Sequence, residues 1–369
     1  MNLKVRIRSL VLLLAFGAVC VGIGYFWRVG FKAALVGIYL RTAPVTWTAG
    51  VPKPARFLKG EDAGATPIAR FEPVVAAAAG RVFVCGGFFN RQLHATSRCD
   101  VFDPATNMWT PLENMPVAVT HAGVAVVGEE IWVAGGFVGG NPGSVTPAVW
   151  RYHIPTNRWS PGPMLPAARG AGGLAFVNRE FHFIGGLRSD RQSDASEHWS
   201  LALQPGAAWR PRAPLPNARN HFSTVAVSGT IHVLGGQHGH DASFVDVADH
   251  HVYDADADSW REATRLPIPR SHTEPGSFFE QGLIFLAGGR SNRIPVLFDV
   301  DAYDPATGKW HAVGGLSQPQ RAPVCRVIGS NLYAGLGGIN ADGIDPSTEW
   351  RRYPISELRI AQVTASPHQ

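Results

Sequence analysis

The stretch Thr230-Ile-His-Val-Leu-Gly-Gly236 places two glycines directly after a short apolar segment. The same arrangement occurs elsewhere, for example at Arg81-Val-Phe-Val-Cys-Gly-Gly87. The six diglycines are spaced by 49, 50, 50, 53 and 49 residues and are Gly86-Gly87, Gly135-Gly136, Gly185-Gly186, Gly235-Gly236, Gly288-Gly289 and Gly337-Gly338. Two glycines after a strand permit positive φ and a close approach of neighbouring chains. A regular period with short strands indicates a β-propeller with one blade per repeat.

A second signature follows the first five diglycines at a distance of 21 to 24 residues from the second glycine, and consists of Trp109, Trp159, Trp209, Trp260 and Trp310. An aspartate next to an aromatic residue stands six residues before three of these tryptophans, at Asp103, Asp254 and Asp304. Aspartate in such a turn can bond to the backbone two residues further on. Diglycine, aromatic-Asp and Trp in this order resemble the kelch repeat over roughly residues 70–350. The resemblance implies an all-β, six-bladed kelch propeller. It leaves function open, because kelch propellers include enzymes, binding proteins and scaffolds.

The sixth blade lacks the tryptophan at the usual distance. Trp350 comes too early and fits a third strand, whereas Trp47 is followed by Pro54 at the spacing that other blades show between tryptophan and proline. We therefore expect residues 42–56 to supply the closing strand of a propeller domain spanning 42–360, with residues 361–369 as a tail. Residues 57–69 then form a loop insertion that could act as a lid. The alternative is a closing strand around Ile360.

The N-terminus predicts export. Residues 9–27 carry no charge and are long enough to nearly span a bilayer, and Lys4, Arg6 and Arg8 precede them. We expect residues 1–41 to hold a transmembrane signal anchor and a juxtamembrane segment, with the propeller in the periplasm or outside the cell. The alternative is a secreted protein whose signal peptide is cleaved.

Charge and cysteines add two expectations. Residues 1–41 contain six of the 33 basic residues and no acidic one, which leaves 27 basic against 28 acidic residues in the remainder. The propeller therefore has no nucleic-acid footprint, and we expect a monomeric propeller.

Cys85 and Cys99 flank one predicted hairpin; an oxidising compartment would permit a disulfide between them, and the alternative is two small buried apolar residues.

In a propeller, the loop that begins each blade and the loop after each diglycine open on the same face. The residues expected to bind a ligand on this face are Arg70, His121, Arg169, Arg219, Asn220, His221, His238, His240, Asp241, Arg270, His272 and Arg321. A ring of arginines could form a funnel for a carboxylated sugar, or could bond to loop carbonyls. His221, His238, His240 and His272 are candidate ligands of a divalent metal. No other cofactor is expected.

The sequence favours a membrane-anchored propeller that binds a carbohydrate or a protein partner. The alternative is an enzyme, either a sugar epimerase or mutarotase or a metal-dependent enzyme acting on an acidic sugar, with Glu72, His221 and Glu274 as candidate acid–base residues. Periplasmic kelch propellers that act on sialic acid resemble this architecture. The segment from Asn220 to Asp241 is similar to that of galactose-oxidase-like bacterial kelch proteins, although the two tyrosines of that copper site have no counterpart on this face. Asp190, Asp194 and His198 resemble the spacing in iron-dependent plant specifier proteins.

Overall fold

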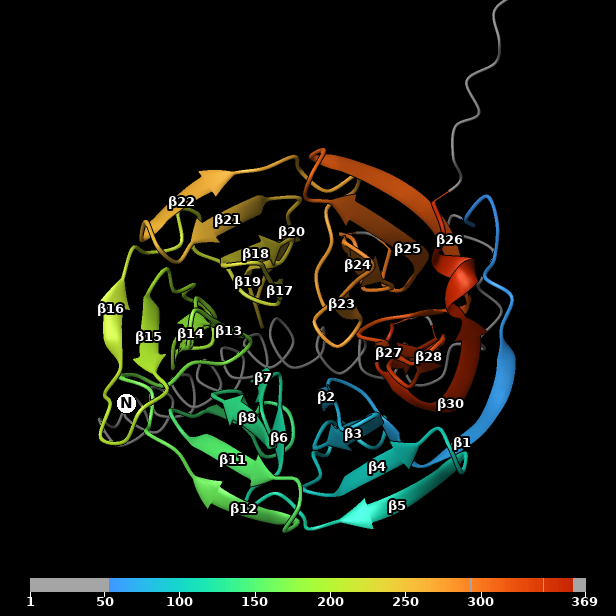
Figure 1. Cartoon of the computed structure of the whole chain (residues 1–369), viewed down its shortest axis with the longest axis horizontal. Helices are drawn as coiled ribbons and strands as arrows, with labels where there is room; N and C mark the ends of the chain where they lie inside the picture. The colour runs from blue at the N-terminus through green and yellow to red at the C-terminus, as the bar shows by residue number, and fades with distance from the viewer. Residues whose placement is uncertain (1–52, 293, 341, 361–369) are drawn as a thin grey trace, which may run out of the picture. The chain divides into compact units, whose positions relative to one another are not determined.

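The computed structural model describes residues 53–292, 294–340 and 342–360. Six four-stranded antiparallel sheets surround a central axis (Figure 1). Along the chain, the first three blades are β2 (Val74–Ala78), β3 (Arg81–Cys85), β4 (Cys99–Asp103) and β5 (Met108–Leu112); β7 (Gly123–Val127), β8 (Glu130–Ala134), β11 (Val149–His153) and β12 (Arg158–Pro161); and β13 (Gly173–Val177), β14 (Glu180–Ile184), β15 (His198–Ala202) and β16 (Arg210–Arg212).

The other three blades continue around the ring. They are β17 (Ser223–Val227), β18 (Thr230–Leu234), β21 (His250–Asp254) and β22 (Ser259–Glu262); β23 (Ser277–Glu280), β24 (Leu283–Ala287), β25 (Leu297–Asp304) and β26 (Lys309–Gln320); and β27 (Val324–Ile328), β28 (Asn331–Gly335), β30 (Asp345–Pro354) and β1 (Glu61–Arg70). Short strands in the loops are β6 (Val119–Thr120), β9 (Phe137–Val138), β10 (Ser144–Val145), β19 (Gln237–Gly239), β20 (Phe244–Asp246) and β29 (Gly338–Ile339), and the 3-10 helix η2 spans Ile355–Leu358.

The diglycines hold each blade against the next one. The amide of Gly87 donates to the carbonyl of Val119 at 2.9 Å, and that of Gly236 donates to Arg270 at 2.8 Å. A Cβ on Gly235 would lie 2.4 Å from the Arg270 carbonyl, so only glycine permits this approach. In blade six the bond to blade one comes from Gly337, and Leu336 takes the first position with φ of 56°. The last repeat is thus shifted by one residue from the predicted diglycine.

The repeated tryptophans tie the outer strands together. The Nε1 atoms of Trp159, Trp209, Trp260 and Trp310 each donate to a carbonyl of the preceding blade at 2.8–3.0 Å. Each such bond contributes about 1 kcal/mol net. Apolar side chains of the inner strands fill the spaces between blades and form the core. The kelch-like pattern therefore marks contacts between blades, and its function is structural.

The closing strand of blade six comes from the N-terminal side, but its predicted position is wrong. β1 (Glu61–Arg70) pairs with β30, with Glu61 opposite Arg352. Residues 61–69 are therefore an outer strand, and they form neither a loop insertion nor a lid. The register sets Gly60 opposite Tyr353, where other blades have their tryptophan, and a Cβ on Gly60 would lie 2.4 Å from the Tyr353 ring. β1 lacks the signature tryptophan because the ring of Tyr353 occupies the space that its side chain would need.

Three further predictions concern the chain's ends and cysteines. The predicted anchor, the predicted closing residues 42–52 and the predicted tail lie outside the described residues. Among residues 53–292, 294–340 and 342–360, no helix has the length and apolar character needed to cross a membrane. Cys85 and Cys99 lie opposite each other on β3 and β4 and form a disulfide. Trp350 lies on β30, the third strand of blade six, as the sequence predicted.

Candidate functional site

One residue per blade surrounds the propeller axis with a left-handed backbone. These six residues, with φ between 50° and 57°, are Glu72, His121, Ala171, His221, His272 and Ala322. Each amide from His121 to Ala322 donates to the carbonyl of the preceding member, at distances of 2.9 to 3.5 Å. The repeat therefore builds a ring of backbone hydrogen bonds, and the side chains at these positions decide the chemistry of the axis.

Three of the axial side chains are histidines, and we call His121, His221 and His272 the axial trio. In each, the preceding residue holds Nδ1: Thr120 at 2.8 Å, Ser271 at 2.7 Å, and Asn220 by a close contact. Because the Ser271 hydroxyl donates to Asp246, it accepts from Nδ1–H of His272. Nε2 of His272 is then a lone-pair acceptor, and Nη2 of Arg321 contacts it. Nε2 of His221 is buried with no hydrogen-bond partner among the described residues.

The trio is compact and has one carboxylate beside it. The rings of His221 and His272 stack with centroids 4.1 Å apart, and His121 lies edge-on to His221 at 4.9 Å. One ring nitrogen from each of the three lies within 4.8 Å of the others. The carboxylate of Glu72 lies 3.7 Å from Nε2 of His121 and 3.9 Å from Nε2 of His272.

Burial determines the charge states along the axis. It lowers the pKa of all three trio histidines well below the usual value, and nearby arginines and histidines lower it further. Burial also raises the pKa of Glu72 to about 7, against the opposing effect of Arg321 and Arg290. The trio is therefore neutral near pH 7, the form in which imidazole nitrogens accept hydrogen bonds or bind metal.

On the diglycine face, His121 and His272 of the trio line a cavity of about 230 Å³, which we call the arginine cavity. Its lining residues include Phe71, Phe88, Phe137, Phe244, Arg191, Arg290, Arg321, His240 and Asp241. Three guanidinium groups lie over phenylalanine rings: Arg191 over Phe137 at 4.4 Å, Arg290 over Phe244 at 3.4 Å and Arg321 over Phe71 at 5.3 Å. Two of their nitrogens, Nη2 of Arg290 and Nε of Arg321, are buried and unpartnered within the described part of the chain.

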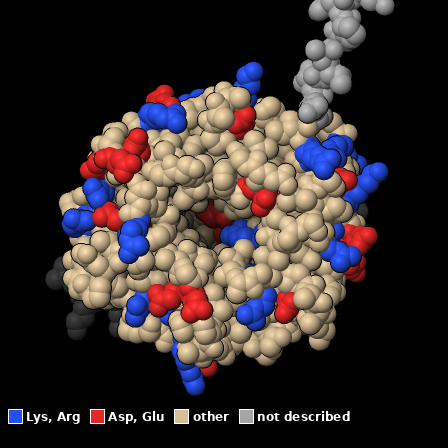
Figure 2. All heavy atoms as spheres, viewed as in Figure 1, with Lys and Arg blue, Asp and Glu red and all other residues tan. Residues whose placement is uncertain are grey.

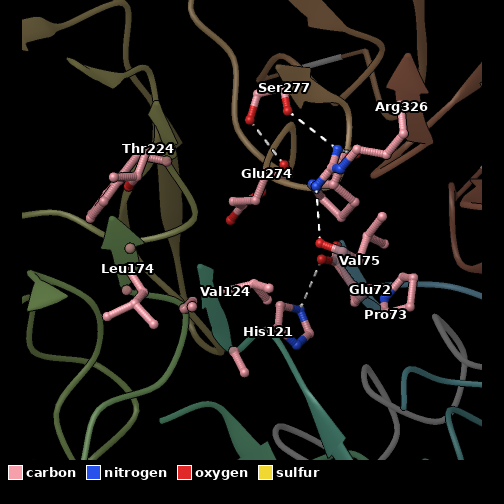
Figure 3. A pocket seen from close by; sticks show the side chains of 17 residues that line it. Glu72, Pro73, Val75, His121, Val124, Leu174, Thr224, Glu274, Ser277 and Arg326 are labelled. Atoms are coloured by element: carbon pink, nitrogen blue, oxygen red, sulfur yellow. Dashed lines mark hydrogen bonds and ion pairs between the residues drawn. The ribbon is translucent and has the colours of Figure 1, made fainter. Parts of the chain in front are cut away.

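A second cavity of about 90 Å³ lies along the inner strands, and we call it the glutamate cavity (Figure 3). Glu72, His121 and Glu274 line it together with Arg326, which donates to the carbonyls of Pro275 and Val75. Burial and the neighbouring Glu72 raise the pKa of Glu274 well above its ordinary value. His121 lines both cavities. Figure 2 shows one face of the propeller hollowed at the centre, with acidic and basic groups inside the hollow.

The predicted arginine ring divides into two classes. Neither axial cavity has Arg70, Arg169, Arg219 or Arg270 among its lining residues. Arg219 donates to the carbonyls of Gly235, Asn217 and Val233, and Arg70 and Arg270 form ion pairs inside their own blades. Arg169 pairs with Glu197. Each of these four stands two positions before its axial residue, whereas Arg321 stands one position before. Because side chains alternate along extended backbone, Arg321 alone of the five points to the cavity.

The predicted metal set is also corrected. His221 and His272 lie together, and His240 stacks on His221 at 5.2 Å but has its Nδ1 2.6 Å from Asp241, which in turn pairs with Arg191. His238 lies apart, because its Nδ1 faces Asp194 at 3.2 Å. His121 replaces it in the cluster. The sequence pattern predicted His121 only as a ligand-binding residue.

Asn220 and the specifier-like residues have local roles. Asn220 donates to Asp194 and to the carbonyl of Gly239, which orients its oxygen toward His221. Asp190 accepts from Ser193 in its own turn, and His198 lies inside blade three. Asp190, Asp194 and His198 therefore do not converge on a site.

Several lining residues escaped the sequence-based prediction. They are Phe71, Phe88, Phe137, Arg191 and Phe244. Phe71 could have been found from its place directly before axial Glu72, the position that holds Arg321 in blade six. Phe88 and Phe137 could have been found from their place directly after the second glycine, the position that holds Arg290 in blade five. Arg191 and Phe244 come from further along the loops after the diglycines, whose lengths differ between blades, so no repeat spacing identifies them.

Comparison with known proteins agrees with this architecture. The kelch motif model matches residues 69–116, 118–166 and 281–317, which belong to blades one, two and five. The human Kelch repeat and BTB domain-containing protein 13 is 33% identical over 84 residues, which are 23% of this chain and 18% of the human protein. Together with the six registered blades, these matches show that the chain contains kelch repeats.

Proposed function

We propose that this propeller is a binding protein that takes a small carboxylate-bearing molecule, such as an acidic sugar, in the arginine cavity. The observation that supports this most directly is the pair of buried, unpartnered guanidinium nitrogens on Arg290 and Arg321. A buried donor without a partner costs about 1–3 kcal/mol, and more when it is charged. A carboxylate satisfies such donors with charge-assisted hydrogen bonds.

The walls of the cavity suit a molecule that has an apolar face as well as a charge. Arginines and phenylalanines alternate around it, and Phe88 and Phe137 come from different blades. Arg191 is paired with Asp241, and Arg290 is paired with Asp246 through Nε but keeps an unpartnered Nη2. Arg321 has a contact with His272 and an unpartnered Nε. The ligand's carboxylate therefore belongs near Arg290 and Arg321, and its ring belongs near the phenylalanines.

The test is isothermal titration of the full chain with acidic sugars and with their neutral counterparts. Arg290→Gln should weaken binding of the acidic sugar about tenfold or more, since one charge-assisted bond is worth about 1.5–3 kcal/mol. Arg158→Gln is the matched control, because Arg158 lies on outer strand β12 with its side chain 74% exposed. Equal affinity for acidic and neutral sugars, or equal losses in the two variants, would contradict the proposal.

A protein partner is the second candidate occupant of this face. Phe244 and Val245, on the β19–β20 hairpin beside the arginine cavity, are 44% and 57% exposed, and Phe89 is 40% exposed. Exposed aromatic groups next to arginine are typical of interaction surfaces. In this case Val245→Ser, which lies outside the lining of the arginine cavity, would weaken capture of the partner and leave acidic-sugar titration unchanged, whereas a small-molecule site would show the reverse for Arg290→Gln.

An enzymatic role is favoured by one further observation. All three acid–base residues predicted from the sequence lie along the axis, and each has an unpartnered buried atom: Oε1 of Glu72, Nε2 of His221 and Oε2 of Glu274. Such atoms are available for proton transfer at a sugar. Proton-exchange NMR of acidic sugars would detect accelerated mutarotation, which Glu274→Gln should abolish without loss of binding. If the unmodified protein does not accelerate mutarotation, its function is binding without catalysis.

We further propose that the propeller works outside the cytoplasm, held by the N-terminal apolar segment. The Cys85–Cys99 disulfide supports an oxidising compartment. Alkylation of the protein in whole cells, followed by mass spectrometry, should find both cysteines protected until a reductant is added. Rapid alkylation of both without reductant would argue against export.

A further inference from the structure

We propose that His121, His221 and His272, with Glu72 beside them, form a binding site for one divalent transition-metal ion on the propeller axis. The site goes beyond the proposed ligand cavity, because its ligands belong to the axial ring itself. Zinc, cobalt, nickel, copper and iron are the ions that several imidazole nitrogens favour.

The first support is the orientation of the rings. Metal-binding histidines almost always donate their other ring N–H to a neighbouring acceptor, which fixes the tautomer and the direction of the lone pair. Each trio histidine has this arrangement with the side chain directly before it, and the acceptors Ser271 and Asn220 are themselves held by further hydrogen bonds. Such second contacts are the expected outer support of a ligand set.

The second support is an unexplained buried atom. Nε2 of His221 belongs to a residue that is fully buried, yet it has no hydrogen-bond partner within the described residues. Nε2 of His121 has Glu72 at 3.7 Å, too far for a hydrogen bond, whereas Nε2 of His272 is in contact with Nη2 of Arg321. Buried nitrogen acceptors without partners are rare in native proteins. A bound cation would satisfy Nε2 of His221, and it would take the place of Arg321 at Nε2 of His272.

The spacing of the donor atoms permits the site after a small contraction. One ring nitrogen of each histidine lies within 4.8 Å of the others. Tetrahedral zinc with bonds of about 2.0–2.1 Å requires nitrogens roughly 3.3–3.4 Å apart. The nitrogens therefore have to approach one another by up to about 1.4 Å. Three histidines leave a coordination position for Glu72, water or a ligand from either cavity, as in zinc sites that keep an open position.

Arg321 opposes the ion and supplies a sharp test. Its Nη2 contacts Nε2 of His272, so metal binding must displace this contact. The carboxylate of Glu72 offsets part of the positive charge of Arg321. Removing the guanidinium should therefore strengthen metal binding, whereas a purely structural cluster would gain nothing.

The experiment compares the set of ligands found in the structure with the set predicted from the sequence. The full chain, stripped by chelator and dialysed, is titrated with Zn²⁺ and Co²⁺, and metal content is measured by elemental analysis. We expect one ion per chain and a Co²⁺ visible spectrum typical of nitrogen ligands in the wild type. His121→Ala should lose the ion, whereas His238→Ala should keep it. Arg321→Gln should bind Zn²⁺ about tenfold more tightly, or ~1.4 kcal/mol.

Folding of each variant is checked by circular dichroism and gel filtration. If His121→Ala does not fold, His221→Ala replaces it, with the same loss expected. No stoichiometric ion in the wild type after titration would overturn the site, and so would equal metal content in the wild type and the trio variant. Weaker Zn²⁺ binding in Arg321→Gln would overturn the inferred role of that arginine. These readouts need no sugar, so their failure leaves the carboxylate-binding proposal to its own test.

Discussion

The protein buries histidine in two different ways. Inside blades three and four, histidines form pairs: Nδ1 of His182 lies 2.9 Å from Nε2 of His198, and Nδ1 of His232 lies 2.9 Å from Nε2 of His250. The second partner of each pair donates its own Nδ1–H to a backbone carbonyl at 3.1 Å. In the axial trio, by contrast, Nε2 of His221 has no hydrogen-bond partner among the described residues, and Nε2 of His272 is contacted by the Arg321 side chain.

Burial and a lowered pKa do not distinguish the two groups, since both have them. The hydrogen-bond partners do. In a pair, each ring satisfies the other, and the pair bridges two strands of one sheet. In the trio, the preceding residue holds Nδ1, and Nε2 of His221 remains available. A buried histidine is therefore a candidate functional group where one nitrogen is fixed and the other is free.

Breaking a pair should have the largest effect on stability. His250→Ala removes two hydrogen bonds, leaves Nδ1–H of His232 without its acceptor and opens a cavity under Tyr303, whose ring centroid lies 4.6 Å from that of His250. We expect a loss of about 3 kcal/mol in the free energy of unfolding, measured by urea denaturation. His153→Ala is the control, because its side chain is 41% exposed, and it should change stability by no more than about 0.5 kcal/mol. Similar losses in both variants would mean that the pairs are not structural bonds.

The second-largest effect on stability is expected from acid, which acts on the same histidine pairs. Burial lowers the pKa of His182 and His232 to about 4 and that of His198 and His250 to about 3. Above pH ~6.5 both folded and unfolded chains keep these rings neutral, so their contribution is complete. Below that pH the histidines take up protons in the unfolded chain but stay neutral in the folded chain. The free energy of unfolding therefore decreases as the pH is lowered from about 6.5 to about 4, and at pH 5 the loss is about 1–2 kcal/mol per histidine.

A double substitution isolates the contribution of the pair in blade four. Blade five has Phe285 and Val300 at the strand positions that His232 and His250 occupy in blade four. His232→Phe with His250→Val should therefore reduce the slope of stability against pH between about 6.5 and 4, followed by chemical unfolding at each pH. An unchanged slope would assign the acid sensitivity to other groups.

The blades were predictable from the sequence because their signature residues perform the same contact in each copy. Gly87 and Gly236 bond to the next blade, and Trp159 and Trp260 bond to the preceding one. Blade six departs from the pattern, since its outer strand comes from another part of the chain and Gly60 stands in the tryptophan position. The prediction of residues 42–56 was based on the spacing between Trp47 and Pro54, whereas the closing strand is β1.

The site was predictable only in part, for a reason of register. Glu72, His121, His221 and His272 share one repeat position, and a strict alignment of the six copies brings them together. Arg321 and the other arginines look equivalent in the sequence, but they are offset by one residue, which reverses the side-chain direction. Phe137 and Arg290 also share a repeat position, directly after the second glycine. The loop that supplies Arg191 differs in length from blade to blade, so its approach to them depends on the folded structure.

The smallest effect on stability is expected at the axis. His221→Ala removes a ring whose Nδ1 has one partner and whose Nε2 has none, and the cavities lined by its neighbours His121 and His272 can admit water to the gap. In the absence of metal we expect a loss of about 1 kcal/mol, measured by the same urea denaturation as His250→Ala. A loss as large as that of His250→Ala would show that the trio is held as firmly as the pairs and that its open nitrogens contribute to folding. A small loss would mean that the protein keeps three buried imidazoles at its axis with little benefit to its own stability, which is the expected behaviour of groups retained for a ligand.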